Sequence, residues 1–332
     1  MQDIACIIAE MRINRKAEWR LFMILTVTLN PTVDKSYYVD KLLPGEVNRI
    51  REFTETPGGK GIQVAKVANL LGQQVRATGF LGGRTGNYIN SFLENAGIET
   101  SFVAVDDETR TCVNVNDAST GRQTELLEPG AKITQEKQQE FLKHYEELLK
   151  DCDIVAISGS VPAGIDENYY PQLIALAKQT GKKVVLDTSG SLLRAGIKAL
   201  PHIIKPNRDE IMELIGREIK TKEEVIAAAS EIRAGGIETV IVSLGKDGAI
   251  FVTGDGVYQG VTPSIKIVNT VACGDSLVAG FATGFCRGMS MTDTIKLAMA
   301  VSTANALRRE TGFFIQEDLD RLLTMVDAVK LK

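Results

Sequence analysis

The sequence has few of the residues that build metal centres, disulfide frameworks and catalytic triads. Its only two histidines, His144 and His202, lie far apart, and we expect both to be structural or at the surface. The five cysteines are scattered and odd in number, and no CxxC pair occurs, so neither a disulfide scaffold nor a zinc site is indicated. A reducing cytoplasm fits this cysteine pattern best.

Membrane and nucleic-acid signals are also absent. No apolar run approaches the roughly 18 residues of a membrane span. The net charge of −4 leaves no broad basic field, so we expect neither a membrane nor a nucleic acid as partner. The chain contains no GxxxxGK[ST] motif and no GxGxxG after its first strand. Its 332 residues, 44% of them hydrophobic, suffice for one large α/β domain or two smaller ones.

Residues 1–22 differ from the rest of the chain. A short apolar run at 4–9 follows Asp3 and is succeeded by mixed charges, without the cleavage pattern of a signal peptide. A strand-like core begins at Met23. We therefore hypothesise that Met23 is the natural start and that residues 1–22 are an upstream extension.

Most of the chain alternates between strand-like and helix-like patterns. Strands are expected at 24–29, 76–81, 154–158, 183–187, 203–205, 239–244 and 264–268, with an antiparallel pair at 249–252 and 257–261. Helices are expected at 62–71, 87–95, 137–150, 167–179, 191–199, 208–215, 222–234, 275–287, 292–309 and 316–328. Such alternation predicts a parallel sheet covered by helices on both faces.

Two regions break this rhythm. Short strands with alternating polarity at 36–39 and 47–53 look like a hairpin, and further strand-like pieces occur near 101–105, 111–116 and 122–127. We expect these pieces to pair in a small separate sheet.

Residues 269–276 (NTVACGDS) are the most informative stretch. They lie between a predicted strand and a predicted helix, which places Asp275 near the first turn of that helix. Free N–H groups and the positive end of the helix dipole make such a turn an anion site. A carboxylate beside an anion suits a base that deprotonates the attacking nucleophile in phosphoryl transfer. Asp275 is expected to be exposed and ionised at pH 7; a plain helix cap is the alternative.

Other polar residues and glycine turns follow the predicted strands. In a parallel sheet these carboxyl ends share one edge, where ligands bind. Consecutive glycines at 57–61 (PGGKG) let backbone amides approach a ligand closely, although a plain turn is the alternative. These residues include several cations and isolated carboxylates, which suits phosphate-bearing ligands and catalysis by positioning of the reactants. They are Asp34, 58–61, 158–160, 205–210, 243–248 and 272–275.

These motifs, in this order, resemble the ribokinase-like sugar kinases of the PfkB family from Met23 almost to the end. The resemblance is carried by 57–61, 158–160 (SGS), 205–207 (KPN) with Glu210, and 269–276. Residues 29–34 (LNPTVD) and 108–110 (ETR) look most like the branch containing tagatose-6-phosphate kinase and 1-phosphofructokinase. The resemblance implies an α/β fold, a three-layer αβα sandwich with a mostly parallel central sheet. It also implies a small β-sheet lid from about 36–56 and 108–127, which in this family often forms a homodimer contact.

The resemblance also implies catalytic and substrate-binding roles. Asp275 would be the general base on a sugar hydroxyl, and the amides of Ala272, Cys273 and Gly274 would stabilise charge on the transferring phosphoryl group. Asp34, Gly58 and Gly59 would bind sugar hydroxyls, with Gln63 nearby. The phosphate already on the sugar would be bound by residues from the set Arg49, Lys60, Arg110 and Ser160.

ATP and Mg²⁺ are the implied cofactors. The residues expected to line the nucleotide site are Lys205, Asn207, Ser243, Gly245 and Gly248. Asn207 and Glu210 would hold Mg²⁺, through water, since this ion keeps most of its hydration shell. A carboxylate that offsets the helix dipole is the alternative for Glu210.

Three positions depart from the family pattern. Ala272 and Cys273 stand where the family has Gly-Ala or Gly-Ser, so Ala272 is strained if that position needs φ > 0. Cys273 at a helix N-terminus is hypothesised to have a lowered thiol pKa. Gln63 stands where asparagine is usual, which bears on sugar preference.

The sequence therefore predicts ATP-dependent phosphorylation of a ketohexose phosphate to the 1,6-bisphosphate. Lys60 and Arg110 favour a substrate that already carries phosphate: tagatose 6-phosphate or fructose 1-phosphate, with fructose 6-phosphate as a third choice. The alternatives are a kinase of another sugar or nucleoside, and a catalytically weak sugar-phosphate or nucleotide sensor on the same scaffold.

Overall fold

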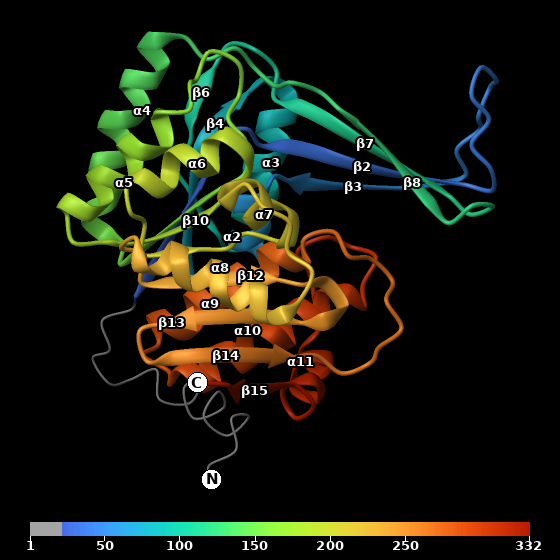
Figure 1. The fold of residues 1–332 in the computed structure, drawn as a ribbon. Coiled ribbons are helices and arrows are strands. Elements are labelled where there is room, and N and C mark those ends of the chain that lie inside the picture. Colours follow the sequence, from blue (N-terminus) through green and yellow to red (C-terminus); the bar gives the residue numbers. More distant parts are fainter. Residues whose placement is uncertain (1–21) are drawn as a thin grey trace.

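The computed structural model describes residues 22–332, so all but the last residue of the hypothesised extension at 1–22 lies outside the described residues. Within them the chain forms one sheet of 11 strands and a second of four. Figure 1 shows helices packed around the large sheet and the small sheet projecting from that body.

The large sheet is parallel through its centre and antiparallel at one edge. Strands β1, β4, β5, β6, β9, β10, β11 and β12 pair in parallel, whereas β12 to β15 pair antiparallel. In spatial order the strands are β15 (Asp327–Lys330), β14 (Gly256–Val261), β13 (Ala249–Thr253), β12 (Thr239–Ser243), β11 (Ile203–Ile204), β10 (Lys183–Asp187), β9 (Ile154–Ser158), β1 (Met23–Thr28), β4 (Gln74–Gly82) and β5 (Glu99–Thr100), with β6 (Val103–Val105) also on β4.

Helices cover both faces of this sheet. One layer contains α2 (Lys60–Leu70), α3 (Gly83–Asn95), α9 (Cys273–Cys286), α10 (Met291–Ala306) and α11 (Gln316–Leu323). The other contains α4 (Gln135–Leu148), α5 (Tyr169–Gln179), α6 (Gly190–Lys198), α7 (Arg208–Ile215) and α8 (Lys222–Ala234). Short 3₁₀ turns occur at Leu149–Asp151 and Gly245–Asp247. Between residues 22 and 332, no helix is both long enough and apolar enough to cross a membrane.

Side-chain alternation along the strands builds the two halves of the core. In β1, Ile24 packs in the cluster with α2 and α9, whereas Leu25 and Val27 pack in the cluster with α4 and α5. All three side chains are essentially inaccessible to solvent. A strand with both faces buried reads as a continuous apolar run, which is why this sheet was recognisable from the sequence.

The small sheet has the strand order β3-β2-β7-β8. Its members are β3 (Glu52–Gly58), β2 (Thr32–Val39), β7 (Arg110–Asp117) and β8 (Arg122–Leu127). One end, where Thr32 pairs with Gly58, lies against the body, and the other end, where Tyr38 pairs with Glu52, continues into the projecting segment 40–51 (Figure 1). The predicted pairing of the 36–53 region with the 111–127 strands is confirmed.

Four predicted elements are wrong. The strand expected at 47–53 is displaced along the chain, since residues 47–51 form no strand and β3 runs over Glu52–Gly58. The 264–268 segment forms no strand, and β14 pairs instead with β13 and β15. The strand near 101–105 pairs with β4 in the large sheet rather than in the small one. The last predicted helix ends at Leu323, and the chain then adds β15 to the open edge of β14. In each case tertiary strand pairing outweighs the local pattern.

Ala272, immediately before α9, has a left-handed backbone conformation. Its φ is 65° and its ψ is 5°. Such a conformation costs an L-residue with a Cβ roughly 1–2 kcal/mol. The turn is held by neighbouring bonds: Val271 N donates to Asn269 Oδ1 at 3.0 Å, and Ser276 N donates to Ala272 O at 2.8 Å. The predicted strain at Ala272 is confirmed.

We predict that Ala272→Gly stabilises the protein. Glycine removes the left-handed penalty but makes the unfolded chain more flexible, so we expect the free energy of unfolding to rise by about 0.5–1 kcal/mol. Chemical denaturation measures this difference. Ala227→Gly is the control: Ala227 is exposed within α8, and the same substitution there should lower the free energy by about 0.5–1 kcal/mol. A loss of stability in Ala272→Gly would contradict the prediction.

Candidate active site

The candidate site lies at the carboxyl ends of β1, β9 and β10. Ser158 ends β9 and pairs with Asp187, which ends β10. The N-terminal ends of α2 and α9 approach the same edge and bring Lys60 and Asp275 to it. This is the sheet edge that the sequence predicted for the ligand.

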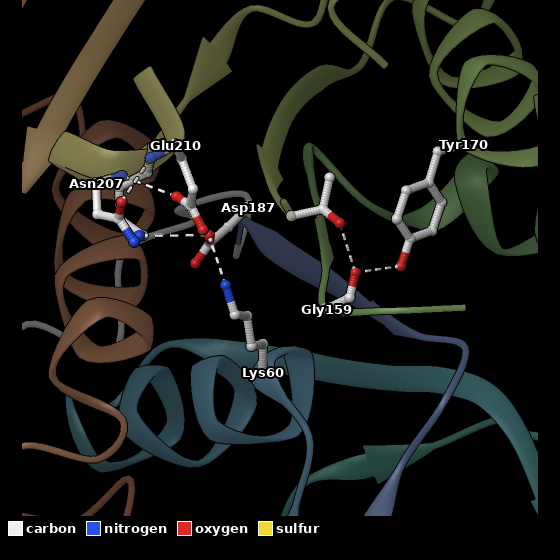
Figure 2. A network of polar contacts seen from close by, with 8 residues as sticks. Lys60, Gly159, Tyr170, Asp187, Asn207 and Glu210 are labelled. Carbon is white, nitrogen blue, oxygen red and sulfur yellow. Dashed lines mark hydrogen bonds and ion pairs between the residues drawn. The ribbon is translucent and has the colours of Figure 1, made fainter. Parts of the chain in front are cut away.

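An ion cluster around the buried Asp187 carboxylate occupies the centre of the site. Asp187 Oδ1 lies 3.1 Å from Lys60 Nζ and 3.3 Å from Lys205 Nζ (Figure 2). Burial alone would raise the pKa of Asp187, but the two lysines outweigh it and hold the pKa below its ordinary value. The Asp187 carboxylate in turn raises the pKa of Lys60. Asp187 and Lys60 are therefore both charged at neutral pH.

This cluster joins three elements that are distant in sequence. Lys60 begins α2, Asp187 ends β10, and Lys205 directly follows β11. Removing either lysine would leave the fully buried Asp187 carboxylate with one counter-charge fewer, which is unfavourable. The cluster therefore fixes the start of α2 relative to the central strands. Sequence reasoning named both lysines but missed Asp187, although it ends a buried strand at the predicted edge.

Asp275 is buried in the first turn of α9. Only 8% of it is exposed, and burial, followed by the nearby Asp187 charge, raises its pKa to about 7. Lys60 and Lys205 oppose this shift. The expectation of an exposed, fully ionised aspartate is therefore wrong: packing of α9 against the sheet covers the carboxyl group.

The turn before Asp275 faces Lys205. A Cβ placed on Gly274 would lie 3.4 Å from Lys205 Nζ, so the lysine passes close to this backbone. Cys273 N donates to Thr270 O at 3.2 Å. Burial raises the pKa of the Cys273 thiol, so the hypothesis of a lowered thiol pKa is wrong.

Asp34 lies in β2 on the other side of the site. Its carboxylate occupies the space beside Gly58: a Cβ on Gly58 would lie 1.9 Å from Asp34 Oδ2. The absence of a side chain at Gly58 is thus required. Burial raises the pKa of Asp34 to about 6, while Lys66 and Arg110 oppose that shift. Gly59 follows with φ 99°, which explains the second glycine of the pair.

Arg110 and Ser160 meet through Asn30. Arg110 donates to Asn30 O at 3.1 Å and to Glu128 O at 3.0 Å, and Asn30 Nδ2 donates to Ser160 Oγ at 3.2 Å. Arg110 Nε is buried and has no hydrogen-bond partner among residues 22–332. The turn at Gly159 is fixed by bonds that its carbonyl accepts from Tyr170 and Thr188 (Figure 2). Asn30 was read from the sequence only as a turn residue.

Gln63 and Lys66 project from α2 toward the loop between α10 and α11. Gln63 Nε2 donates to Thr311 Oγ1 at 3.0 Å, and Lys66 Nζ donates to Gln63 Oε1 at 3.0 Å and to Thr311 O at 2.7 Å. Sequence reasoning missed Lys66. A lysine on the buried face of a helix was the available signal.

Asn207 and Glu210 form a capping box at the start of α7. Glu210 N donates to Asn207 Oδ1, and Asn207 N donates to Glu210 Oε2, both at 2.8 Å. In Figure 2 the Glu210 side chain extends toward Asp187. Asn207 also bridges to Ser243 at the end of β12. The 3₁₀ turn that follows contains Gly245.

Gly248 and Arg49 are less directly connected to this edge. A Cβ on Gly248 would lie 2.1 Å from Gly260 O, so Gly248 permits the close contact of its turn with β14. Arg49 is exposed in segment 40–51, at the end of the small sheet remote from Asp34. Within one chain the structure does not bring Arg49 to the other predicted site residues.

The side-chain oxygens at this edge suit a Mg²⁺ ion that keeps most of its water better than a metal ion enclosed by protein ligands. Among residues 22–332, no group of three or more His, Cys, Asp or Glu side chains could hold a metal ion. Asp187 Oδ2, however, is buried without a hydrogen-bond partner in that part of the chain, and the Glu210 side chain points toward the Asp187 carboxylate (Figure 2). Mg²⁺ characteristically binds through one or two carboxylates, water and substrate phosphates.

Comparison with known proteins places this arrangement in a family. The model of the pfkB family of carbohydrate kinases matches residues 26–318. A candidate phosphofructokinase from Staphylococcus aureus is 33% identical, with 93% of this chain and 99% of that chain covered and a TM-score of 0.80.

Two further structures agree. Phosphofructokinase-2 from Escherichia coli, in complex with substrates and products, is 30% identical over 91% of this chain and 99% of that chain, with a TM-score of 0.85. A candidate 1-phosphofructokinase from Thermotoga maritima is 28% identical over 93% and 100%, with a TM-score of 0.84. The predicted ribokinase-like α/β fold is confirmed, and the chain belongs to the pfkB family of carbohydrate kinases.

Proposed function

We propose that this carbohydrate kinase transfers the γ-phosphoryl group of ATP to a ketohexose monophosphate, tagatose 6-phosphate or fructose 1-phosphate, and forms the 1,6-bisphosphate. The observation that carries the proposal is the position of Asp275, a buried carboxyl group at a helix N-terminus beside two lysines. The comparisons support a kinase; the substrate and the roles below are our inference.

Asp275 acts as the general base. It accepts the proton of the sugar hydroxyl as the oxygen attacks the γ-phosphorus, and the bond from that phosphorus to the ADP oxygen breaks. A pKa near 7 matches this task, because the group is substantially ionised at neutral pH and still has appreciable basicity.

The start of α9 and the lysine cluster stabilise the transferring phosphoryl group. The backbone turn at Ala272, Cys273 and Gly274 and the positive helix end lie beside it. Cys273 N is already bonded to Thr270, so the amides farther into the first turn carry most of this interaction. Lys60, which was predicted to bind the sugar's own phosphate, is paired with Asp187 and acts instead at the transferring group.

The sugar lies between Asp34 and Asp275. Asp34 accepts hydrogen bonds from its hydroxyls, with the Gly58 and Gly59 backbone alongside. Its phosphate is bound by Arg110, whose Nε has no protein partner among residues 22–332, and by Ser160. An arginine suits a phosphate because it offers donors in a fixed planar fork.

ATP binds at the part of the sheet edge where α7 and the end of β12 meet. We assign its site to Lys205, Asn207, Ser243, Gly245 and Gly248. Asn207 and Glu210 would hold Mg²⁺, with Asp187 Oδ2 as a further acceptor. When bound, Mg²⁺ neutralises charge on the phosphates.

The small sheet acts as a lid, and we propose that it also joins two copies of the chain. Tyr37, Phe53, Val115 and Leu126 share the face of the small sheet that is opposite to Asp34. Phe53 is 62% exposed and Leu126 is 60% exposed, which is unusual for a paired apolar face. An Escherichia coli phosphofructokinase-2 is known in a tetrameric inhibited form, so assembly occurs in a structural neighbour.

The dimer proposal predicts a change in mass in solution. Light scattering should give twice the chain mass for the wild type and a monomer for the Phe53→Lys/Leu126→Lys variant, because two buried charges oppose pairing. Met325→Lys is the control: Met325 is 46% exposed at the end of α11, and its substitution should leave the dimer intact. A monomeric wild type at micromolar concentration would refute the dimer.

Turnover on a panel of sugars tests the kinase proposal. We expect ADP formation from Mg-ATP with tagatose 6-phosphate or fructose 1-phosphate, less with fructose 6-phosphate, and little with free fructose. Asp275→Asn should lower kcat by about 10²–10⁴-fold while the fold and ATP binding persist, because the amide cannot accept the proton.

The matched control is Asp293→Asn. Asp293 also lies in the first turn of a helix, α10, where Ser290 caps it, and its change should leave turnover intact. Near wild-type turnover in Asp275→Asn would refute the base assignment. Sugar-phosphate binding without ADP formation by the wild type would favour the sensor alternative.

The raised pKa of Asp275 predicts an acidic limb in the rate. We expect kcat/KM, which reports the free enzyme, to fall below a midpoint near pH 7, approaching tenfold per pH unit, because the protonated carboxyl cannot act as a base. The folded protein also holds this proton more tightly than the unfolded chain, so the contribution of Asp275 to the free energy of unfolding decreases as pH rises from about 4 to 7. Steady-state rates from pH 5 to 9 check the limb; a midpoint near 4 would contradict it.

A further inference from the structure

Lys66 is a buried charge that the mechanism above leaves without a role. Only 9% of it is exposed, and burial lowers its pKa to about 8, so it remains mostly charged at neutral pH. Lysine is almost never this buried unless its charge is compensated. An apolar side chain could fill the same space without that cost, so the charge needs a physical explanation.

The contacts of Lys66 lead to the backbone next to Asp34. Its ammonium group holds Gln63 Oε1 and the Thr311 carbonyl, and Gln63 Nε2 donates both to Thr311 Oγ1 and to Pro57 O, the latter at 3.3 Å. Pro57 precedes Gly58, the residue against which the Asp34 carboxylate packs. Both the oxygen and the nitrogen of the Gln63 amide therefore take part in holding the backbone at Pro57 and Gly58.

The α10–α11 loop, which carries Thr311, packs closely against the Gln63 amide. A Cβ on Gly312, whose φ is 61°, would lie 2.1 Å from Gln63 Oε1. Thr311 Oγ1 also lies 3.4 Å from the Thr56 hydroxyl in β3. We call Lys66, Gln63 and Thr311 the clamp. It joins α2, the α10–α11 loop and the end of β3.

Lys66 also acts electrostatically on Asp34. It is the strongest of the charges that offset the burial of Asp34; Arg110 adds to it and Glu125 opposes it. The other charged groups that face Lys66 are Asp275 from α9 and Glu310 from the α10–α11 loop. Without the ammonium group, the Asp34 carboxylate would be harder to keep ionised in its buried position.

We propose that Lys66 is a positioning residue for the sugar: through the clamp it fixes the backbone at Pro57 and Gly58, and its charge keeps Asp34 as a carboxylate that can accept hydrogen bonds from sugar hydroxyls. The proposal deepens the proposed function and rests on it, because it takes Asp34 as the sugar-binding carboxylate. It assigns Gln63 to holding the protein backbone rather than to touching the sugar.

The test compares Lys66→Met with Lys66→Arg. The dissociation constant of the sugar phosphate that supports turnover is measured by calorimetry at pH 6 and pH 8, without nucleotide. Lys66→Met should weaken binding by about ten- to a hundredfold, the equivalent of one or two charge-assisted hydrogen bonds, and leave ATP binding unchanged. Lys66→Arg should restore most of the affinity, because it keeps the charge and the donors.

The pH dependence separates positioning from a purely structural role. The ratio of the Lys66→Met and wild-type dissociation constants should be larger at pH 6 than at pH 8, since loss of the cation raises the pKa of Asp34 and leaves it protonated at pH 6. Ionisation of the ligand phosphate cancels in this ratio. A ratio independent of pH, or an equal loss of affinity in both variants, would overturn the electrostatic part of the proposal.

Lys178→Met is the matched control. Lys178 Nζ also donates two hydrogen bonds, both to backbone carbonyls, of Ala199 at 3.1 Å and Leu200 at 2.7 Å, but at the C-terminal end of α5. Its removal should leave sugar-phosphate binding unchanged. If Lys178→Met weakens binding as much as Lys66→Met, the effect is global and the proposal fails.

Hydrogen exchange tests the clamp independently of the substrate. In Lys66→Met, amides of residues 309–313 and 54–58 should exchange faster than in the wild type, while those of β9 and β10 stay unchanged. Unchanged exchange in both segments would overturn the positioning role. If the wild type binds no sugar phosphate of the panel, the proposed function fails, and the exchange result still decides whether the clamp exists.

Discussion

The contact of Asp187 with Lys60 and Lys205 is the constraint on which the rest of the site depends. One fully buried carboxylate oxygen holds two ammonium groups within 3.3 Å: that of Lys205, which is also buried, and that of Lys60, which is partly exposed. The three residues come from β10, the start of α2 and the end of β11, so their attraction fixes the helix to the sheet at the ligand-binding edge. Helix α2 also carries Gln63 and Lys66. Its position therefore determines the position of the clamp, and through the clamp the position of Gly58 and the neighbouring Asp34.

The same cluster sets the chemistry of Asp275. With Asp187 and Asp275 both ionised, their charges balance those of the two lysines; with Asp275 protonated, the group carries one net positive charge. Burial and Asp187 favour the protonated form, and the lysines favour the carboxylate, which leaves the pKa of Asp275 near 7. An anionic phosphoryl group entering this region adds negative charge, which makes the carboxyl group a stronger proton acceptor. The arrangement therefore increases the basicity of Asp275 when a phosphate is present.

The sequence allowed the alternation of strands and helices to be predicted because the central strands are buried on both faces and glycine turns separate them. It also located Asp275, since a glycine-containing turn before a helix is a local feature. The burial of Asp275 could not be predicted, because it arises from packing of α9 on strands more than 80 residues away in sequence. Asp187 and Lys66 were missed for a related reason: each looks like an ordinary charged residue until another element supplies its partner. β15 could not be foreseen, because its pairing depends on the open edge of β14.

The two carboxyl groups that we propose to contact the sugar come from a strand of the small sheet, β2, and from a helix, α9, and the α10–α11 loop connects them. On one side Asn305 Nδ2 donates to Val271 O at 2.8 Å and Asn269 Nδ2 donates to Arg309 O at 2.9 Å, so the loop and the end of α10 hold the turn before Asp275. On the other side Thr311 accepts bonds from Lys66 and Gln63 beside Asp34. These bonds also account for the left-handed conformation of Ala272, since a strained residue persists only where its surroundings over-determine it. A displacement of Thr311 would therefore be felt at both carboxyl groups, which makes this loop a physical link between Asp34 and Asp275.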